Sequence, residues 1–210
     1  MKEFLYCYKM THDDGFAPNP YHGVLTLATC KPKIRKNAKI GFWISGWTSN
    51  EVQGKTDKFY FTDKNQKLIY LAKVTDKIKI EKYWDLYKDK RPQIISNGKE
   101  KETNCCGKNN PSASAYDMGD NIYEPIEGGF KQHSNGGGHD ESNKEHDLSG
   151  EYVLICKDYY YFGVEQAIDV EGKDFVVPRC KKFSLDDQEA KNVIDFVTKN
   201  YSRGINPQRK

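Results

Sequence analysis

The segment around residue 140 holds the residue types best suited to acid–base chemistry. His133, His139 and His146 lie six and seven residues apart, and Asp140 follows His139 directly. A metal site would need these histidines on a fixed scaffold, but glycine and polar residues surround them, and we predict no metal ligand here. We predict a long loop over residues 127–150, which is either solvated or a lid that folds His139 and Asp140 over a ligand.

A run of basic residues is a candidate for phosphate binding. Lys31, Lys33 and Arg35 lie in "CKPKIRKNA", where Pro32 suits the first turn of a helix over residues 32–39. Backbone N–H groups at the start of such a helix, helped by Lys31 or Lys33, could hold a phosphate group. The alternative is a solvated helix face.

Two tryptophans are candidates for stacking on a base. Trp43 and Trp47 are four residues apart, so on one strand they would face the same side. Paired aromatic rings can hold a flipped or single-stranded base. Core packing is the other interpretation, and the same choice applies to the aromatic run at residues 159–162.

Evidence for a nucleophile is thin in the sequence. Cys30 precedes Lys31, which could lower the pKa of the thiol, and His22 is near in sequence, but no familiar Cys-His signature surrounds them. Asp13 and Asp14 are adjacent and would point in different directions, which argues against a pair of cooperating carboxylates.

The elements that position these residues are predicted to be strands interleaved with short helices. Alternating apolar residues predict strands at 3–9, 23–29, 40–47 and 67–80, within 151–164, and at 174–180. Short helices are predicted at 32–39 and 81–88, and a C-terminal helix is predicted over 184–201, with Ser184 as N-cap. This order predicts an α+β fold with a mostly antiparallel, curved sheet or a small PUA-like β-barrel.

Composition limits the class of protein. The chain has 210 residues and a net charge of +3, a smaller basic excess than most duplex-binding proteins carry. The six cysteines form no C-x-x-C pair, and no signal peptide or membrane-spanning run is visible. We predict a cytoplasmic single domain over residues 1–210, folded over about 3–200, with long loops at 99–116 and 127–150 and a tail at 204–210.

Several segments together carry a resemblance to a known family. They are "GFAPNPYHGVLTLATCKPKIRKNAKIGFWISGW", "LIYLAKVTDKIKIEKYW", "NIYEP", "HD" and "DYYYFG". Over roughly residues 3–200 the chain resembles the second type of nucleotide modification-associated domain, found in bacteria and phages. The resemblance implies a link to DNA base hypermodification. The family pattern reads Gly-Asp-Trp where this chain has Gly-Phe-Trp at 41–43, so no carboxylate role is carried over there.

Three functions are compatible with these features. The first is binding of a nucleotide, a modified base or single-stranded nucleic acid, without a cofactor. The second is an enzyme acting on a base or nucleotide precursor, with Asp14 and His139 as acid–base candidates. The third is a module of a phage or defence system that binds a protein partner through its long loops. The oligomeric state is left open. The residues predicted to line the ligand pocket are Asn19, Tyr21, Lys31, Lys33, Arg35, Trp43, Trp47, Tyr123, His139 and Asp140.

Overall fold

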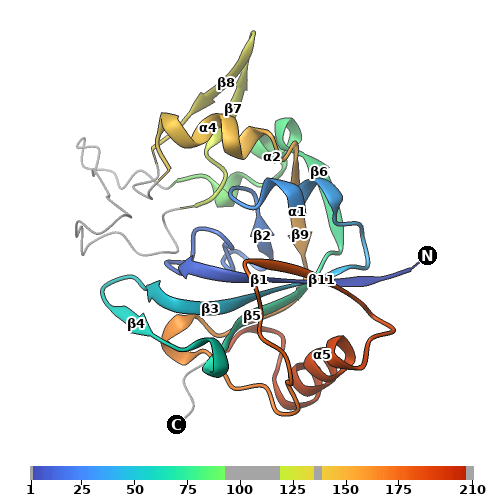
Figure 1. Cartoon of the computed structure of the whole chain (residues 1–210). Helices are drawn as coiled ribbons and strands as arrows, with labels where there is room; N and C mark the ends of the chain where they lie inside the picture. Colours follow the sequence, from blue (N-terminus) through green and yellow to red (C-terminus); the bar gives the residue numbers. More distant parts are fainter. Residues whose placement is uncertain (1, 93–118, 135–138, 207–210) are drawn as a thin grey trace. The chain divides into compact units, whose positions relative to one another are not determined.

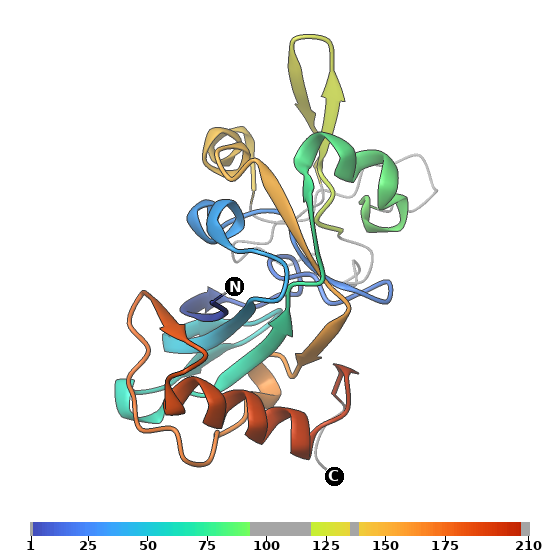
Figure 2. The same cartoon turned by 90° about the vertical axis from the view of Figure 1, so that its right-hand side faces the viewer.

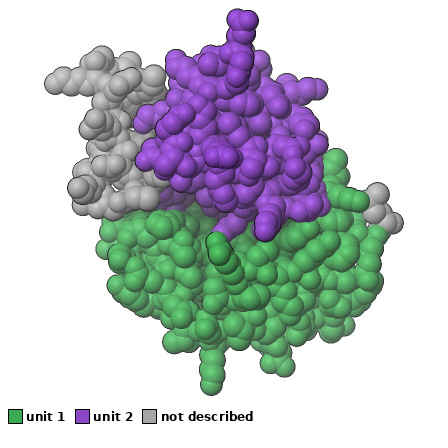
Figure 3. Space-filling model, turned by 45° about the horizontal axis from the view of Figure 1, so that its top comes forward, with its two compact units in different colours: residues 1–13, 39–75, 156–210 green, residues 14–38, 76–155 purple. Residues whose placement is uncertain are grey.

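The contacts of the chain divide it into two compact units. A computed structural model describes residues 2–92, 119–134 and 139–206 (Figure 1). Unit 1 is made of residues 1–13, 39–75 and 156–210, and unit 2 of residues 14–38 and 76–155 (Figure 3). Compact units defined by contacts need not be separate domains, so the single domain stays a prediction.

Unit 1 is built on one open sheet of seven strands. β1 runs parallel to β3, β10 runs parallel to β12, and the other pairs are antiparallel, including β3 with the short β4. The sheet order is β11 (Cys180–Ser184), β1 (Phe4–His12), β3 (Trp43–Gln53), β5 (Leu68–Lys73), β10 (Asp158–Tyr161) and β12 (Gly204–Ile205), with β4 (Lys58–Tyr60) beside β3.

A single amphipathic helix covers one face of this sheet. The buried side chains of α5 (Gln188–Asn200) are Ala190, Val193 and Val197, which recur at helical spacing and join the sheet residues in one core. Figure 2 shows α5 running alongside the sheet. The predicted C-terminal helix is therefore present, but it begins later. Asp187 is the N-cap, and Ser184 ends β11, where its N–H donates to Asp187 Oδ2 at 2.9 Å.

Unit 2 combines a small sheet, short helices and a hairpin. Its core includes Phe16, Tyr83, Ile122 and Val153. The sheet order is β2 (Leu25–Leu27), β9 (Tyr152–Cys156) and β6 (Asp76–Lys79). The helices are α1 (Pro32–Asn37), α2 (Ile80–Leu86) and α4 (Glu141–Leu148). The hairpin pairs β7 (Tyr123–Ile126) with β8 (Gly129–Gln132). A single 3₁₀ turn lies at Lys88–Lys90 in this unit, and two more lie in unit 1, at Asp63–Asn65 and Val164–Gln166.

The α+β class with a mostly antiparallel sheet is confirmed, with differences in detail. The sheets of the described residues are open, so none closes into the alternative barrel. The predicted strand at 67–80 breaks after Lys73, and its halves β5 and β6 belong to different sheets. In the part of the chain that the structure describes, no helix is long and apolar enough to cross a membrane.

The prediction of one loop over residues 127–150 is wrong. Strand β8 and helix α4 lie inside it. Helix α4 has few apolar residues, so it shows no hydrophobic stripe in the sequence. Its start is set instead by a capping box, in which the Asp140 side chain accepts from Ser142 N and the Asn143 side chain accepts from Asp140 N. The predicted loop at 99–116 lies outside the described residues.

Candidate active site

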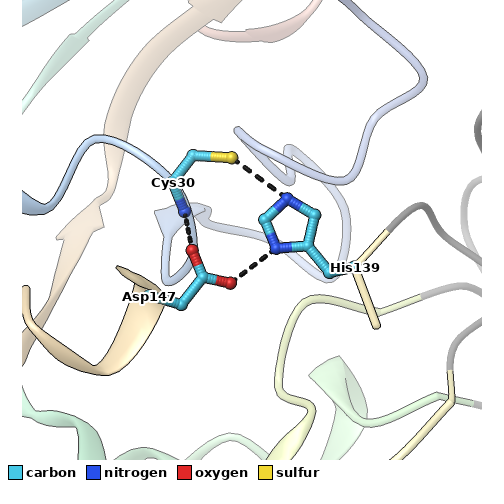
Figure 4. Close-up of side chains that lie close together, drawn as sticks. All are labelled: Cys30, His139 and Asp147. Carbon is cyan, nitrogen blue, oxygen red and sulfur yellow. Dashed lines mark hydrogen bonds and ion pairs between the residues drawn. The ribbon is translucent and has the colours of Figure 1, made fainter. Parts of the chain in front are cut away.

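Three side chains from distant parts of the sequence of unit 2 meet in one hydrogen-bonded chain. Cys30 Sγ lies 3.3 Å from His139 Nε2, and His139 Nδ1 lies 2.5 Å from Asp147 Oδ2 (Figure 4). Each imidazole nitrogen therefore has a different partner, the thiol on one side and the carboxylate on the other. This is the order of groups found in nucleophile–histidine–acid triads.

Cys30 sits on a sharp turn between a strand and a helix. Strand β2 ends at Leu27 and helix α1 begins at Pro32. Within this turn, Cys30 and Lys31 have φ angles of 53° and 40°, in the left-handed region that residues other than glycine rarely adopt. A nucleophile on such a strained strand-to-helix turn projects its side chain away from the backbone, as in the nucleophile elbow of hydrolases. The Cys30 side chain is partly exposed, and therefore reachable.

Asp147 is the fully buried centre of the network. Its Oδ1 accepts from the Cys30 backbone N–H at 2.7 Å, and its Oδ2 accepts from the Tyr123 hydroxyl at 2.9 Å as well as from His139. These hydrogen bonds offset the cost of burying the carboxylate. The same carboxylate thus fixes the turn that carries the thiol and the orientation of the imidazole.

His139 is held on its other sides as well. Its backbone carbonyl accepts from Gln132 Nε2 at 2.8 Å, and its ring meets the edge of Phe16, with ring centroids 5.0 Å apart. Helix α4 starts directly after it, at the Asp140 cap. The imidazole therefore has a fixed orientation rather than the freedom of a solvated loop.

Arg35 ties the two halves of the site together. Its fully buried guanidinium donates to the carbonyl oxygens of Ala28, on the Cys30 turn, and of Asp147, on α4. Burial lowers the pKa of Arg35, and the nearby Asp147 charge opposes this shift. A Cβ at Gly150 would overlap the guanidinium, so the position admits only glycine while Arg35 is in place. Arg35 is therefore a structural clamp.

The electrostatics of the site favour a charged imidazole. Burial lowers the pKa of His139, but the hydrogen bonds and negative charges of Asp147 and Cys30 outweigh this effect and raise it to about 10. At neutral pH His139 is then an imidazolium, with Asp147 at its Nδ1 and Cys30 at its Nε2. Burial and the neighbouring Asp147 charge raise the pKa of Tyr123, which therefore stays protonated as a donor.

The same three side chains also offer one sulfur, one nitrogen and one oxygen within 4.8 Å of one another, a set that zinc accepts. However, the two oxygens of Asp147 point to Cys30 N and to His139 Nδ1, so a metal ligand at Asp147 would break these hydrogen bonds. The geometry fits acid–base and nucleophilic chemistry better than metal coordination.

The structure brings three of the predicted site residues, Arg35, Tyr123 and His139, into this network. Arg35 is buried, so its predicted contact with a ligand phosphate would need the clamp to open. Lys31 and Lys33 flank Cys30, with Lys33 exposed and Lys31 partly exposed.

The other predicted residues of unit 2 have structural contacts. Asn19 is fully buried, and its Oδ1 accepts from Lys90 Nζ and from the backbone N–H of Tyr21. Asp140 caps α4, and Asp14 accepts from the backbone N–H of Phe16. The carboxylate that completes the triad is neither of these aspartates.

The two tryptophans belong to unit 1. Trp43 and Trp47 lie in the core covered by α5, in line with the core-packing interpretation of these residues. Trp47 Nε1 donates to Ser45 Oγ at 2.9 Å. Because Trp47 has no exposed surface, a base could stack on it only if this core opened.

Sequence reasoning missed Asp147 and undervalued Cys30. Asp147 lies two helical turns after Asp140, but the polar sequence of α4 concealed the helix that points it inward. The doublet His146-Asp147 repeats His139-Asp140 seven residues later, which is about two helical turns. This repeat was a usable signal, because an acid at this spacing after a cap lies on the same side of the helix as the cap residue.

A comparison with protein families gives a match over almost the whole chain. The family model described as nucleotide modification associated domain 2 matches residues 2–208. No curated protein and no solved structure is similar enough to match. The chain therefore belongs to the nucleotide modification associated domain 2 family.

Proposed function

We propose that this protein is an enzyme that uses Cys30 as a nucleophile in an acyl-transfer or hydrolysis step of nucleotide modification. The observation that carries the proposal is the hydrogen-bonded chain from Cys30 through His139 to the buried Asp147. A solvated loop or a purely structural cluster does not need a partly exposed thiol at the end of such a chain.

The chemistry follows from the order of the groups. The Cys30 thiolate attacks the carbonyl carbon of an amide or ester, which forms a C–S bond. The C–N or C–O bond then breaks, and the leaving group takes a proton from the His139 imidazolium. Neutral His139 next removes a proton from water, which attacks the thioester. The C–S bond breaks, which releases a carboxylic acid and restores the Cys30 thiolate and the His139 imidazolium, and Asp147 holds the imidazole orientation throughout.

Membership of the family supports a base, nucleotide or nucleotide precursor as the substrate. The acyl group is what the proposed thiol chemistry requires. Lys31 follows Cys30 on the turn and Lys33 lies at the start of α1, and their ammonium groups suit a phosphate of such a substrate. In this proposal, the nucleotide binding predicted from the sequence is the binding of the substrate.

Acyl-enzyme capture tests this proposal. The protein is mixed with p-nitrophenyl acetate and with N-acetylated cytidine and adenosine, quenched in acid, and examined by intact and peptide mass spectrometry. We expect an acetyl group on Cys30 and none on the exposed Cys180, which is the internal control.

The His139→Gln variant should lose the adduct, and Lys33→Met should keep it with p-nitrophenyl acetate, which has no phosphate. Acetylation of Cys30 and Cys180 at equal rates would contradict the proposal. Zinc bound in stoichiometric amount, together with loss of reactivity after chelation, would indicate the metal site instead.

A further inference from the structure

Unit 1 contains a hollow that none of the chemistry above uses. It lies between the 3₁₀ turn Val164–Gln166 and the segment that follows α5, and it has a volume of about 690 Å³. This is within the range of small-molecule sites, which is roughly 300–1,000 Å³. All of its lining residues belong to unit 1, so the hollow is separate from the residues of the Cys30 site.

Hydrogen-bond acceptors dominate the polar lining. Gln166 Oε1 is buried and has no hydrogen-bond partner among the described residues, which costs free energy. A turn of the Gln166 side chain into the hollow would bring this oxygen to a ligand. Asn200 and Asn206 direct their Nδ2 atoms to the carbonyl oxygens of Phe196 and Gly204. These hydrogen bonds do not use the side-chain oxygens of the two asparagines, both of which line the hollow as residues.

The charges in the hollow disfavour an anion. Glu165 and Asp169 are both exposed at its wall. The single lysine of the lining, Lys67, has its Nζ 3.3 Å from Asp169 Oδ2, so its charge is already balanced. A phosphate or carboxylate would meet the remaining negative charge, whereas an N–H donor or a cation would be attracted.

Aromatic rings complete the wall. Phe162 and Tyr201 pack edge to face with ring centroids 4.9 Å apart, and both line the hollow. Such rings offer apolar contact to an organic body and attract a nearby cation.

We propose that this hollow binds a small organic amine, a ligand that presents N–H donors to Gln166 and the two asparagines and carries no phosphate. The amine can come from the exocyclic group of a nucleoside or from an aliphatic polyamine, and both satisfy the same acceptors. This proposal does not depend on the proposed Cys30 chemistry, so an experiment can refute one of the two proposals without affecting the other.

Calorimetric titration of the whole protein tests the site. The probes are cytidine, uridine, cytidine monophosphate and spermidine. Cytidine and uridine differ at the group that the acceptors should recognise, and the monophosphate adds only the anion. We expect cytidine or spermidine to bind at one site, and uridine and cytidine monophosphate to bind at least about tenfold more weakly.

Variants then locate the binding. Gln166→Met should lower the affinity for the bound amine about tenfold. It should leave the stability of the unliganded protein equal or higher, because it removes a buried acceptor that has no partner. Glu165→Gln with Asp169→Asn should weaken spermidine but not cytidine. Asp174→Asn, an exposed carboxylate outside the hollow, is the matched control. The proposal is overturned if neither amine binds at millimolar concentration, if uridine and the monophosphate bind equally well, or if Gln166→Met changes nothing.

Discussion

Different interactions stabilise the interiors of the two units. The core of unit 1 is apolar, with Trp43, Trp47 and the α5 stripe packed on one face of the sheet. Asp13 is its one buried acidic or basic residue among the described residues. Unit 2 buries Arg35, Lys90, Asp120 and Asp147. Because burying a charge is unfavourable unless it is paired and hydrogen-bonded, the polar interior of unit 2 is costly for stability, and it is where the candidate active site lies.

The buried charges of unit 2 outside the site follow the same rule. Asp120 accepts from the hydroxyls of Thr26 and Tyr83, and Lys90 donates to the carbonyl oxygens of Asn19 and Val24. Burial raises the pKa of Asp120, and the charge of Lys90 opposes this shift. Unit 2 thus relies on hydrogen-bonded networks around buried charged residues, whereas unit 1 relies mainly on packing.

The largest effect should follow from opening the apolar core of unit 1. Trp47→Ala removes the largest fully buried side chain and leaves a cavity, so the free energy of unfolding should fall by about 3–5 kcal/mol. Urea denaturation measures this loss, and hydrogen exchange should show it in β3 and β5. An effect below about 1 kcal/mol would mean that the core around Trp47 is not packed as described.

The clamp residue should be the most sensitive position of unit 2. Arg35→Met leaves two buried carbonyl oxygens without their donor and removes a positive charge near the Asp147 carboxylate, which should cost about 3 kcal/mol. Lys33→Met makes the same charge change on the exposed side of α1 and should stay within about 0.5 kcal/mol. Equal stability of the two variants in urea denaturation would refute the clamp.

The pH dependence of stability should distinguish His139 from an ordinary histidine. Its pKa in the folded protein is about 10, above the usual value of 6.5, so it binds its proton more tightly when folded. The stabilisation is then complete below about pH 6.5 and is lost as the pH rises through about 10. The wild type should therefore lose its stability advantage over His139→Gln between these pH values. An advantage that is constant from pH 6 to 10 would contradict the charged imidazole.

Within the hydrogen-bonded network of the site, a smaller effect is expected at Tyr123. Tyr123→Phe removes one of the donors to Asp147 Oδ2 and leaves the other contacts of the carboxylate in place, so the free energy of unfolding should fall by about 1 kcal/mol. Thermal denaturation measures it. A loss as large as that of Arg35→Met would show that the hydroxyl, and not the guanidinium, is the main support of Asp147.

The sequence predicts unit 1 better than unit 2, for a physical reason. Strands such as β1 and β3 and the helix α5 bury apolar side chains at regular spacing, and this pattern is visible without a structure. Helix α4 is formed by a cap and by the contacts of Asp147, and its polar sequence resembles a loop. The site depends on such non-local contacts, because Cys30 lies 109 residues from its partner His139.

The most direct test of the account is the rate at which iodoacetamide alkylates Cys30 relative to Cys180 at neutral pH, read for each peptide by mass spectrometry. Cys180 is exposed and lies outside the triad, whereas Cys30 is only partly exposed. The account predicts that Cys30 reacts at least about tenfold faster, because its sulfur lies within hydrogen-bond distance of His139 Nε2, and that His139→Gln removes this excess. Alkylation of Cys30 at or below the rate of Cys180 in the wild type would contradict it.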